Sequence, residues 1–194
     1  WGFPVGPFQL LDEVGIDVAA NVARVTGAAF GERMRPPEIF DALARSGRKG
    51  RRTGRGFYLY KPHPRAAAKR WNVDATVAEL IRVSPGRSGP VTNDEVALRC
   101  SLAMVNEALR AYGEGIVRRP RDGDIGAIFG VGFPAFRGGP FRYVDVLGSV
   151  EVLRRIRSLE QRFGARFEPA PRGLLQRLKG LWSAPEPFTV LEVL

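Results

Sequence analysis

Among its 194 residues the chain has one cysteine, Cys100, and one histidine, His63. A single cysteine excludes a disulfide within the chain, and together the two residues offer too few soft ligands for a zinc site. No stretch reaches the roughly 18 consecutive apolar residues of a membrane-spanning helix. The first residues also lack the basic and then apolar pattern of a signal peptide. These absences predict a cytoplasmic protein with no metal site and no transmembrane segment.

The sequence also lacks a glycine-rich turn between a strand and a helix, which is the pattern that binds dinucleotides. Only Phe57–Tyr60 is predicted to be an extended segment, and it is too short to form the basis of a β-sheet. Apolar residues instead recur at helical spacing in five places. These places follow Asp17 (Val18, Val22, Val25, Ala29), Pro36-Pro37, Asp74, Thr92 and Ser149 (Val152, Ile156, Leu159, Phe163). The sequence therefore predicts an all-α fold.

The longest of these helices begins after Thr92, which forms a capping box with Glu95. One apolar stripe runs along it, made of Leu98, Leu102, Val105, Leu109 and Tyr112. Three further residues widen the stripe: Val96, Cys100 and Ala103. We therefore expect this helix to be buried on more than one side.

Glycine and proline, with 23 and 15 residues, are concentrated in a string that occurs twice. The chain opens on WGFPVGPFQLLDEVG, and residues 132–148 read GFPAFRGGPFRYVDVLG. Eight positions agree in order, with Gly6-Pro7-Phe8 matching Gly139-Pro140-Phe141 after a three-residue insertion. Asp12 then matches Asp145, and Gly15 matches Gly148. The repetition predicts two tandem related helical units, 1–83 and 91–194, joined by a Gly/Pro/Ser-rich linker at 84–90.

Several long motifs resemble the C-terminal helical domain of 3-hydroxyacyl-CoA dehydrogenases. They are GFPVGPFQLLDEVGIDV near the start, GRKGRRTGRGFYLY at 47–60, RCSLAMVNE at 99–107, and EGIVRRPRDGDIGAIFGVGFPAFRGGPFRYVDVLG from Glu114. The likeness runs from Trp1 to about Pro169. The same stretch resembles the carboxyl end of the multifunctional α-subunits of fatty-acid β-oxidation. Because the chain starts at Trp1, inside the first copy of the repeat, we expect it to be a piece of a longer polypeptide.

The resemblance implies an enzyme that oxidises an L-3-hydroxyacyl-CoA with NAD. The cofactor, the catalytic His and its Glu would belong to a Rossmann domain outside this sequence, so we expect the fragment to be inactive and to bind no cofactor. Its implied partners are the acyl-CoA, its own Rossmann and crotonase-like domains, a thiolase β-subunit and a second copy of itself. In the family's first helical unit the catalytic Asn belongs to an Asn-Arg pair that would precede Trp1, and the second copy has Leu98 at the equivalent position.

No residue of the chain is therefore predicted to be catalytic, and His63 lies between two prolines in a charged loop. The candidate substrate-binding residues are those of the first Gly/Pro corner: Phe3, Pro4, Gly6, Pro7 and Phe8. In one reading this rigid corner forms one wall of the acyl-CoA cleft, and glycine allows the backbone to approach the ligand closely. In the other it only joins two helices and buries its phenylalanines. We expect the second copy, at Gly139, to have the same local geometry with a structural role.

The remaining polar residues indicate structure rather than chemistry. Asp12 and Asp145 each stand three residues before a glycine, which suits carboxylates that accept backbone N–H groups at a helix start. Asp122 and Asp124 suit capping as well. Asn106 is expected to form buried hydrogen bonds between helices.

The net charge of +10 gathers at residues 45–55, where arginines alternate with glycines. We expect these cations to be exposed and mobile, so that neutralising two of them hardly changes stability. A basic excess also suits a nucleic-acid-binding module. That alternative lacks aromatic residues interleaved with the charges and a recognition helix. A purely structural all-α interaction module is the third reading, and the sequence leaves it open.

Overall fold

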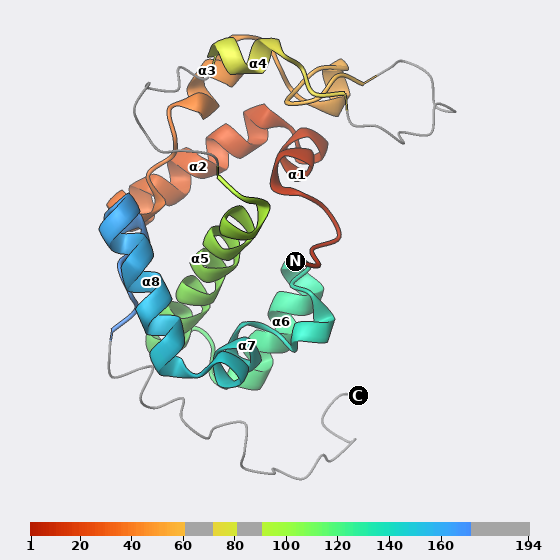
Figure 1. Ribbon diagram of the computed structural model, residues 1–194. Coiled ribbons are helices and arrows are strands. Elements are labelled where there is room, and N and C mark those ends of the chain that lie inside the picture. Colours follow the sequence, from red (N-terminus) through yellow and green to blue (C-terminus); the bar gives the residue numbers. More distant parts are fainter. Residues whose placement is uncertain (61–71, 81–90, 172–194) are drawn as a thin grey trace. The chain divides into compact units, whose positions relative to one another are not determined.

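The computed structural model describes residues 1–60, 72–80 and 91–171. Across these ranges the regular structure is helical, and the backbone pairings near residues 50–59 and Val73 are isolated bridges. The prediction of an all-α fold is thus confirmed (Figure 1). His63, the predicted linker at 84–90 and the segment from 174 onward lie outside the described residues.

The chain divides into two compact units, which we call the first unit (residues 5–90) and the second unit (residues 1–4 and 91–194). The first four residues therefore belong with the second half of the sequence. The proposed repeat boundaries, 1–83 and 91–194, stay a prediction.

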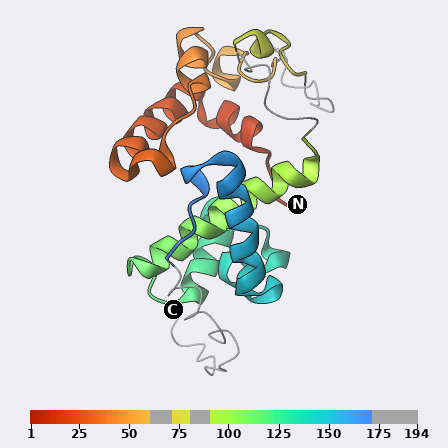
Figure 2. The ribbon, with the colours of Figure 1, turned by 60° about the vertical axis from the view of Figure 1, so that its left-hand side comes forward.

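The first unit contains α1 (Pro7–Val14), α2 (Ile16–Phe30), α3 (Ile39–Arg45) and α4 (Thr76–Leu80), with 3-10 turns at Gly31–Met34 and Arg51–Thr53. In Figure 2 α2 and α3, in red and orange, lie side by side. The core is small: Ile16, Leu43, Phe57 and Val77 are its buried members. The apolar stripe that the helical spacing indicates on α2 is exposed and does not belong to this core. Val18 is 43% exposed, Val22 is 53% exposed and Val25 is 63% exposed.

The second unit contains α5 (Asn93–Gly113), α6 (Pro120–Val131), α7 (Pro140–Leu147) and α8 (Ser149–Phe163), with 3-10 turns at Ala135–Arg137 and Ala165–Phe167. Helix α7 lies against α5, α6 and α8 (Figure 1). The core of the second unit is much larger than that of the first unit. The fully buried members are Leu102, Val105, Leu109, Phe133, Phe141, Tyr143, Val144, Val152, Ile156, Leu159, Phe167 and Ala170.

Helix α5 confirms most of its predicted features. The backbone N–H of Glu95 donates to Thr92 Oγ1 over 3.1 Å, which caps the helix. The predicted stripe is buried at its centre and half-buried at Leu98 and Tyr112. The expected burial on more than one side holds for Ala103, which packs on the core, but not for Val96, which is 44% exposed, or for Cys100, which is exposed.

The two helix pairs that follow the repeated string have matching dimensions. Helices α1 and α7 each have eight residues and begin at a proline, and α2 and α8 each have fifteen. A glycine with positive φ separates the helices in both pairs: Gly15 at 106° and Gly148 at 84°. Glycine is the residue that adopts this conformation without strain. A duplicated origin stays a prediction.

The expectation that Gly6 and Gly139 share one local geometry is wrong. Gly139 has φ 101°, and a Cβ there would overlap the side chain of Asp124. Gly6 has φ −71° and ψ 155°, an extended conformation open to any residue, and no atom lies within 4 Å of its Cβ position. A neighbouring carboxylate thus lies close to the second of the two glycines only.

Candidate functional site

The five predicted substrate residues are divided between the two units. Phe3 packs on the core of the second unit, where its ring stacks on Trp1 at 5.2 Å and meets Phe133 edge-on at 6.0 Å. The Arg137 guanidinium lies 4.1 Å above the Trp1 ring, and its Nε donates to the Trp1 carbonyl over 3.0 Å. This cluster fixes the start of the chain on the second unit.

Gly6, Pro7 and Phe8 belong to the first unit. The Phe8 ring stacks on Phe57 with 4.5 Å between centroids, yet 52% of Phe8 is exposed. The corner is therefore anchored by a phenylalanine at each end. Pro4, Gly6 and Pro7, between the anchors, are exposed. A role of these residues in substrate binding stays a prediction.

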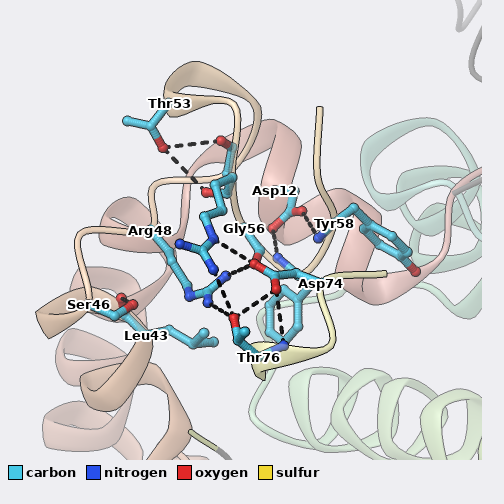
Figure 3. Close-up of polar contacts among 12 residues, drawn as sticks. Asp12, Leu43, Ser46, Arg48, Thr53, Gly56, Tyr58, Asp74 and Thr76 are labelled. Atoms are coloured by element: carbon cyan, nitrogen blue, oxygen red, sulfur yellow. Dashed lines mark hydrogen bonds and ion pairs between the residues drawn. The ribbon is translucent and has the colours of Figure 1, made fainter. Parts of the chain in front are cut away.

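Asp12 is the polar centre of the first unit (Figure 3). The side chain is buried, and its two carboxylate oxygens accept the backbone N–H of Phe57 at 2.9 Å and of Tyr58 at 3.0 Å. The hydroxyl of Tyr60 donates to Asp12 over 3.0 Å, and burial together with this bond raises the pKa of Tyr60. Asp12 accepts backbone N–H groups as predicted. They belong to an extended segment, however, so the expected helix start is wrong.

Two glycines of the GRKGRRTGRG string make this contact with α1 possible. A Cβ at Gly56 would overlap the carboxylate of Asp12, and one at Gly50 would overlap the Asp12 backbone. The close approach of the two backbones therefore requires glycine at both positions. The basic string is thus a loop shaped to dock on α1.

A buried ion-pair network closes this loop at its base. The Arg48 guanidinium donates to Asp74, to Thr76 and, over 3.1 Å, to the carbonyl of Gly56 (Figure 3). Arg55 donates to the same Asp74 carboxylate over 2.6 Å. The hydrogen bonds from Arg55 and Arg48 hold the pKa of Asp74 well below its usual range, against the opposing effect of burial. The expectation that all the cations of 45–55 are exposed is therefore wrong for Arg48, which is only 5% exposed.

The outer cations of the loop form ion pairs with α1 and α2. Arg51 donates to Glu13 over 2.6 Å, and both Arg52 and Lys49 pair with Asp17, at 2.6 and 3.8 Å. No local sequence pattern indicates these pairs, because the partners stand 32 to 38 positions apart. Three of the cations that suggested a polyanion partner are thus paired with Glu13 and Asp17.

In the second unit, carboxylates and amides have structural roles. Asp124 is buried and accepts the backbone N–H of Phe141 at 2.7 Å, so it caps α7 rather than its own helix, α6, which it was expected to cap. Asp122 is exposed and pairs with Arg119 at 2.9 Å. Asp145 accepts no backbone N–H from the described residues, contrary to the prediction. Burial raises its pKa, although Arg142 at 4.0 Å opposes this shift.

Asn106 forms buried hydrogen bonds, as predicted. Its partners are not another helix but the segment after α8: the Ala170 N–H donates to Oδ1 and Nδ2 donates to the Glu168 carbonyl, both over 2.8 Å. Arg110 donates to the same carbonyl over 2.7 Å. These bonds seat Phe167 and Ala170 in the core.

Within residues 1–60, 72–80 and 91–171, no group of three or more His, Cys, Asp or Glu side chains is placed to hold a metal ion. No helix of these ranges combines the length and the apolar character that crossing a membrane requires. The carboxylates described above are engaged by backbone N–H groups or by arginines. Their arrangement stabilises the fold.

Comparison with known proteins gives consistent results. Residues 1–60 match the family model of the 3-hydroxyacyl-CoA dehydrogenase C-terminal domain. The chain is 47% identical over 177 residues to the fatty acid oxidation complex subunit alpha of Vibrio vulnificus, covering 91% of this chain and 24% of that protein. It thus spans about a quarter of the length of that relative.

Two solved structures share the fold. The 3-hydroxybutyryl-CoA dehydrogenase of Escherichia coli aligns with TM-score 0.66 and 22% identity, over 94% of this chain and 52% of that one. The dehydrogenase part of multifunctional enzyme 1 from C. elegans aligns with TM-score 0.64 and 24% identity, over 91% and 39%. By its motifs and its sequence relatives, the chain is similar to the C-terminal helical region of the 3-hydroxyacyl-CoA dehydrogenase family, whose model residues 1–60 match.

Proposed function

We propose that this chain is the C-terminal helical part of an NAD-dependent L-3-hydroxyacyl-CoA dehydrogenase within a multifunctional, cytoplasmic β-oxidation protein. The observation that carries the proposal is the 47% identity over 177 residues to a fatty acid oxidation complex subunit alpha. NAD would be held by a Rossmann domain ahead of this chain and would accept the hydride from the substrate. A crotonase-like domain in the same polypeptide, a thiolase subunit and a second copy are the proposed partners.

The contribution of this chain is to close the acyl-CoA site with a rigid corner. Phe3 and Phe8 anchor the corner at its two ends, by stacking on Trp1 and on Phe57. Pro4, Gly6 and Pro7 are exposed, and each proline restricts the backbone at its own position. Such a corner can exclude water beside an acyl thioester at no cost in side-chain entropy, because Gly and Pro have little to lose.

The alternatives have less support from the geometry. Four cations of the basic segment, Lys49, Arg51, Arg52 and Arg55, are paired with carboxylates of the same unit. A nucleic-acid-binding module would need these charges for phosphates. A purely structural module differs from our proposal only in predicting no effect of the corner on turnover.

The first test is activity. The purified chain should form no NADH from an L-3-hydroxyacyl-CoA and NAD, whereas a longer polypeptide that includes the preceding domains should. Turnover by the chain alone would contradict the placing of the cofactor and the catalytic base outside it.

The second test concerns the corner. In the longer polypeptide, Pro7→Ala should lower dehydrogenase turnover per folded molecule about tenfold or more, because small displacements near a reacting centre are costly. Hydratase activity serves as the internal control. Pro140→Ala, the matched change in the second unit, should leave dehydrogenase turnover per folded molecule unchanged. Equal losses in the two variants would remove the corner from the substrate site.

A further inference from the structure

We propose that Phe57 is a positioning residue for the dehydrogenase reaction. Its ring supports the ring of Phe8, and through Phe8 it fixes the place of Gly6 and Pro7 in the corner. This inference rests on the proposed function, because it takes the corner to be part of the acyl-CoA site. It extends that function to a residue outside the corner, which the resemblance did not mark as a site residue.

The contact between the two phenylalanines joins the corner to the core of the first unit. The rings are stacked, with 4.5 Å between centroids and 22° between the ring planes. This geometry is among the favourable ones for an aromatic pair. The two residues differ in burial, because Phe8 is 52% exposed whereas Phe57 is only 5% exposed and belongs to the core. Phe57 therefore links a solvent-accessible residue to a fixed part of the unit.

The backbone at Phe57 is held by hydrogen bonds on both sides of its side chain. Its N–H donates to Asp12 over 2.9 Å, and its carbonyl accepts the backbone N–H of Asp74 at 3.0 Å. The preceding carbonyl, of Gly56, accepts from Arg48 at 3.1 Å. The Asp12, Asp74 and Arg48 side chains are all buried. A satisfied buried polar network makes its members rigid, so the Phe57 ring is a fixed support for Phe8.

A displacement of Phe8 reaches the corner through the main chain. Pro7 directly precedes Phe8, and its ring restricts the backbone at that position. In the first turn of α1 the backbone N–H of Leu10 donates to the Gly6 carbonyl over 2.9 Å. This bond closes the turn, so the residues from Gly6 to Leu10 move together. Since small displacements near a reacting centre are costly, the support of Phe8 matters for turnover.

The matched phenylalanine of the second unit has a different support, which provides a control. Phe141 is 2% exposed and meets Tyr112 of α5 edge-on, with 5.8 Å between centroids. Tyr112→Leu therefore removes a ring contact from the same position of the repeated string without touching the first unit. Leu43→Ala is a second control, because Leu43 is fully buried in the same core as Phe57.

Hydrogen exchange in this chain tests the support itself. Phe57→Leu keeps an apolar side chain in the core but removes the ring. Relative to the other amides of the first unit, the Leu10 N–H should then exchange with deuterium about threefold to tenfold faster, the effect of losing one aromatic pair. Leu43→Ala should speed the Leu10 N–H no more than the other amides of the unit. An equal response of this amide in the two variants would contradict support of the first turn by Phe57.

Turnover in the polypeptide that includes the preceding domains tests the role in the reaction. Phe57→Leu should lower the dehydrogenase kcat per folded molecule about tenfold, while hydratase turnover stays unchanged. Leu43→Ala and Tyr112→Leu should leave both activities per folded molecule unchanged. Circular dichroism gives the folded fraction, so a role in stability alone would not alter kcat. Phe57→Met, which also lacks the ring, replaces Phe57→Leu if that variant folds poorly.

The outcomes separate this inference from the proposed function. An unchanged dehydrogenase kcat in Phe57→Leu, or an equal loss in Leu43→Ala or Tyr112→Leu, would overturn the positioning role while the parent polypeptide remains an active dehydrogenase. A parent polypeptide without dehydrogenase activity would contradict the proposed function, and it would also remove the reaction in which Phe57 is assigned a role. A loss of dehydrogenase turnover confined to Phe57→Leu, together with faster exchange at Leu10, is the result that we expect.

Discussion

The helix pairs α1–α2 and α7–α8 have the same lengths and the same glycine joint, yet different elements support them. Helix α7 is covered by α5 and α6 and capped by Asp124. Helix α1 is held from another side, by a basic loop whose backbone donates to Asp12. A repeated sequence pattern thus specifies the local geometry of a helix pair, while the elements packed around it decide which of its residues are buried.

The matched aspartates show the difference most directly. Asp12 is 1% exposed and accepts three hydrogen bonds from the 57–60 segment. At the same position of α7, Asp145 has only an ion pair with Arg142 at 4.0 Å among the described residues, and its pKa is raised by burial. The carboxylate is retained in the sequence of both helices, but its donors are present in only one.

The largest expected effect is at the base of the basic loop. Arg48→Met should lower the free energy of unfolding by about 3 kcal/mol or more, because it removes a buried charge and its bonds to Asp74, Thr76 and the Gly56 carbonyl. Arg52→Met, at a 61% exposed side chain of the same loop, should leave it nearly unchanged. Urea denaturation followed by circular dichroism measures both. Equal effects would mean that the loop does not support α1 through Arg48.

The next prediction concerns the matched aspartates. Asp12→Ala should cost about 2–3 kcal/mol, because it leaves buried backbone N–H groups of Phe57 and Tyr58 without an acceptor. Asp145→Ala should cost less than about 1 kcal/mol, since it removes a single long ion pair. Chemical denaturation of the two variants under identical conditions tests the contrast. A reversed order would show that the two helices are supported alike.

A smaller effect is expected at the two glycines before the helices. Gly139→Ala should cost about 1–3 kcal/mol, because alanine is strained at φ 101° and its Cβ would displace the capping Asp124. Gly6→Ala should change stability by less than about 0.5 kcal/mol, since Gly6 is extended and has free space around it. Thermal unfolding of both variants is sufficient. A large loss at Gly6 would mean that an element of this chain crowds it as Asp124 crowds Gly139.

Features set by neighbours in the sequence were predictable. The helical spacing, the Thr92 cap and the glycine joints at Gly15 and Gly148 all depend on residues a few positions apart, and the structure contains all of them. Burial of Val152, Ile156 and Leu159 also followed, because α8 has one clearly apolar face.

Features set by distant partners were not predictable. Nothing near Arg48 in the sequence indicates that its side chain is buried and paired with Asp74, 26 positions later. The exposed stripe Val18, Val22, Val25 has the same spacing as a buried one. Its counterparts in α8, Glu151, Arg155 and Ser158, are polar. Periodicity identifies a face but not what packs on it.

The smallest expected effect is the pH dependence of Asp145. Burial raises the pKa of this carboxyl in the folded state, so folding favours its protonated form. Stability therefore falls as pH rises from the ordinary carboxyl pKa to the raised one, and the penalty persists at neutral pH. Asp145→Asn should remove the penalty and stabilise the chain at pH 7, by less than about 1 kcal/mol because the Arg142 pair is lost as well. Near pH 3 the Asp145 carboxyl is protonated in both the folded and the unfolded state, so variant and parent should unfold alike. Denaturation series at the two pH values check the sign. A variant less stable than the parent at pH 7 would show that Asp145 has a donor comparable to those of Asp12, which would erase the contrast between the two helices.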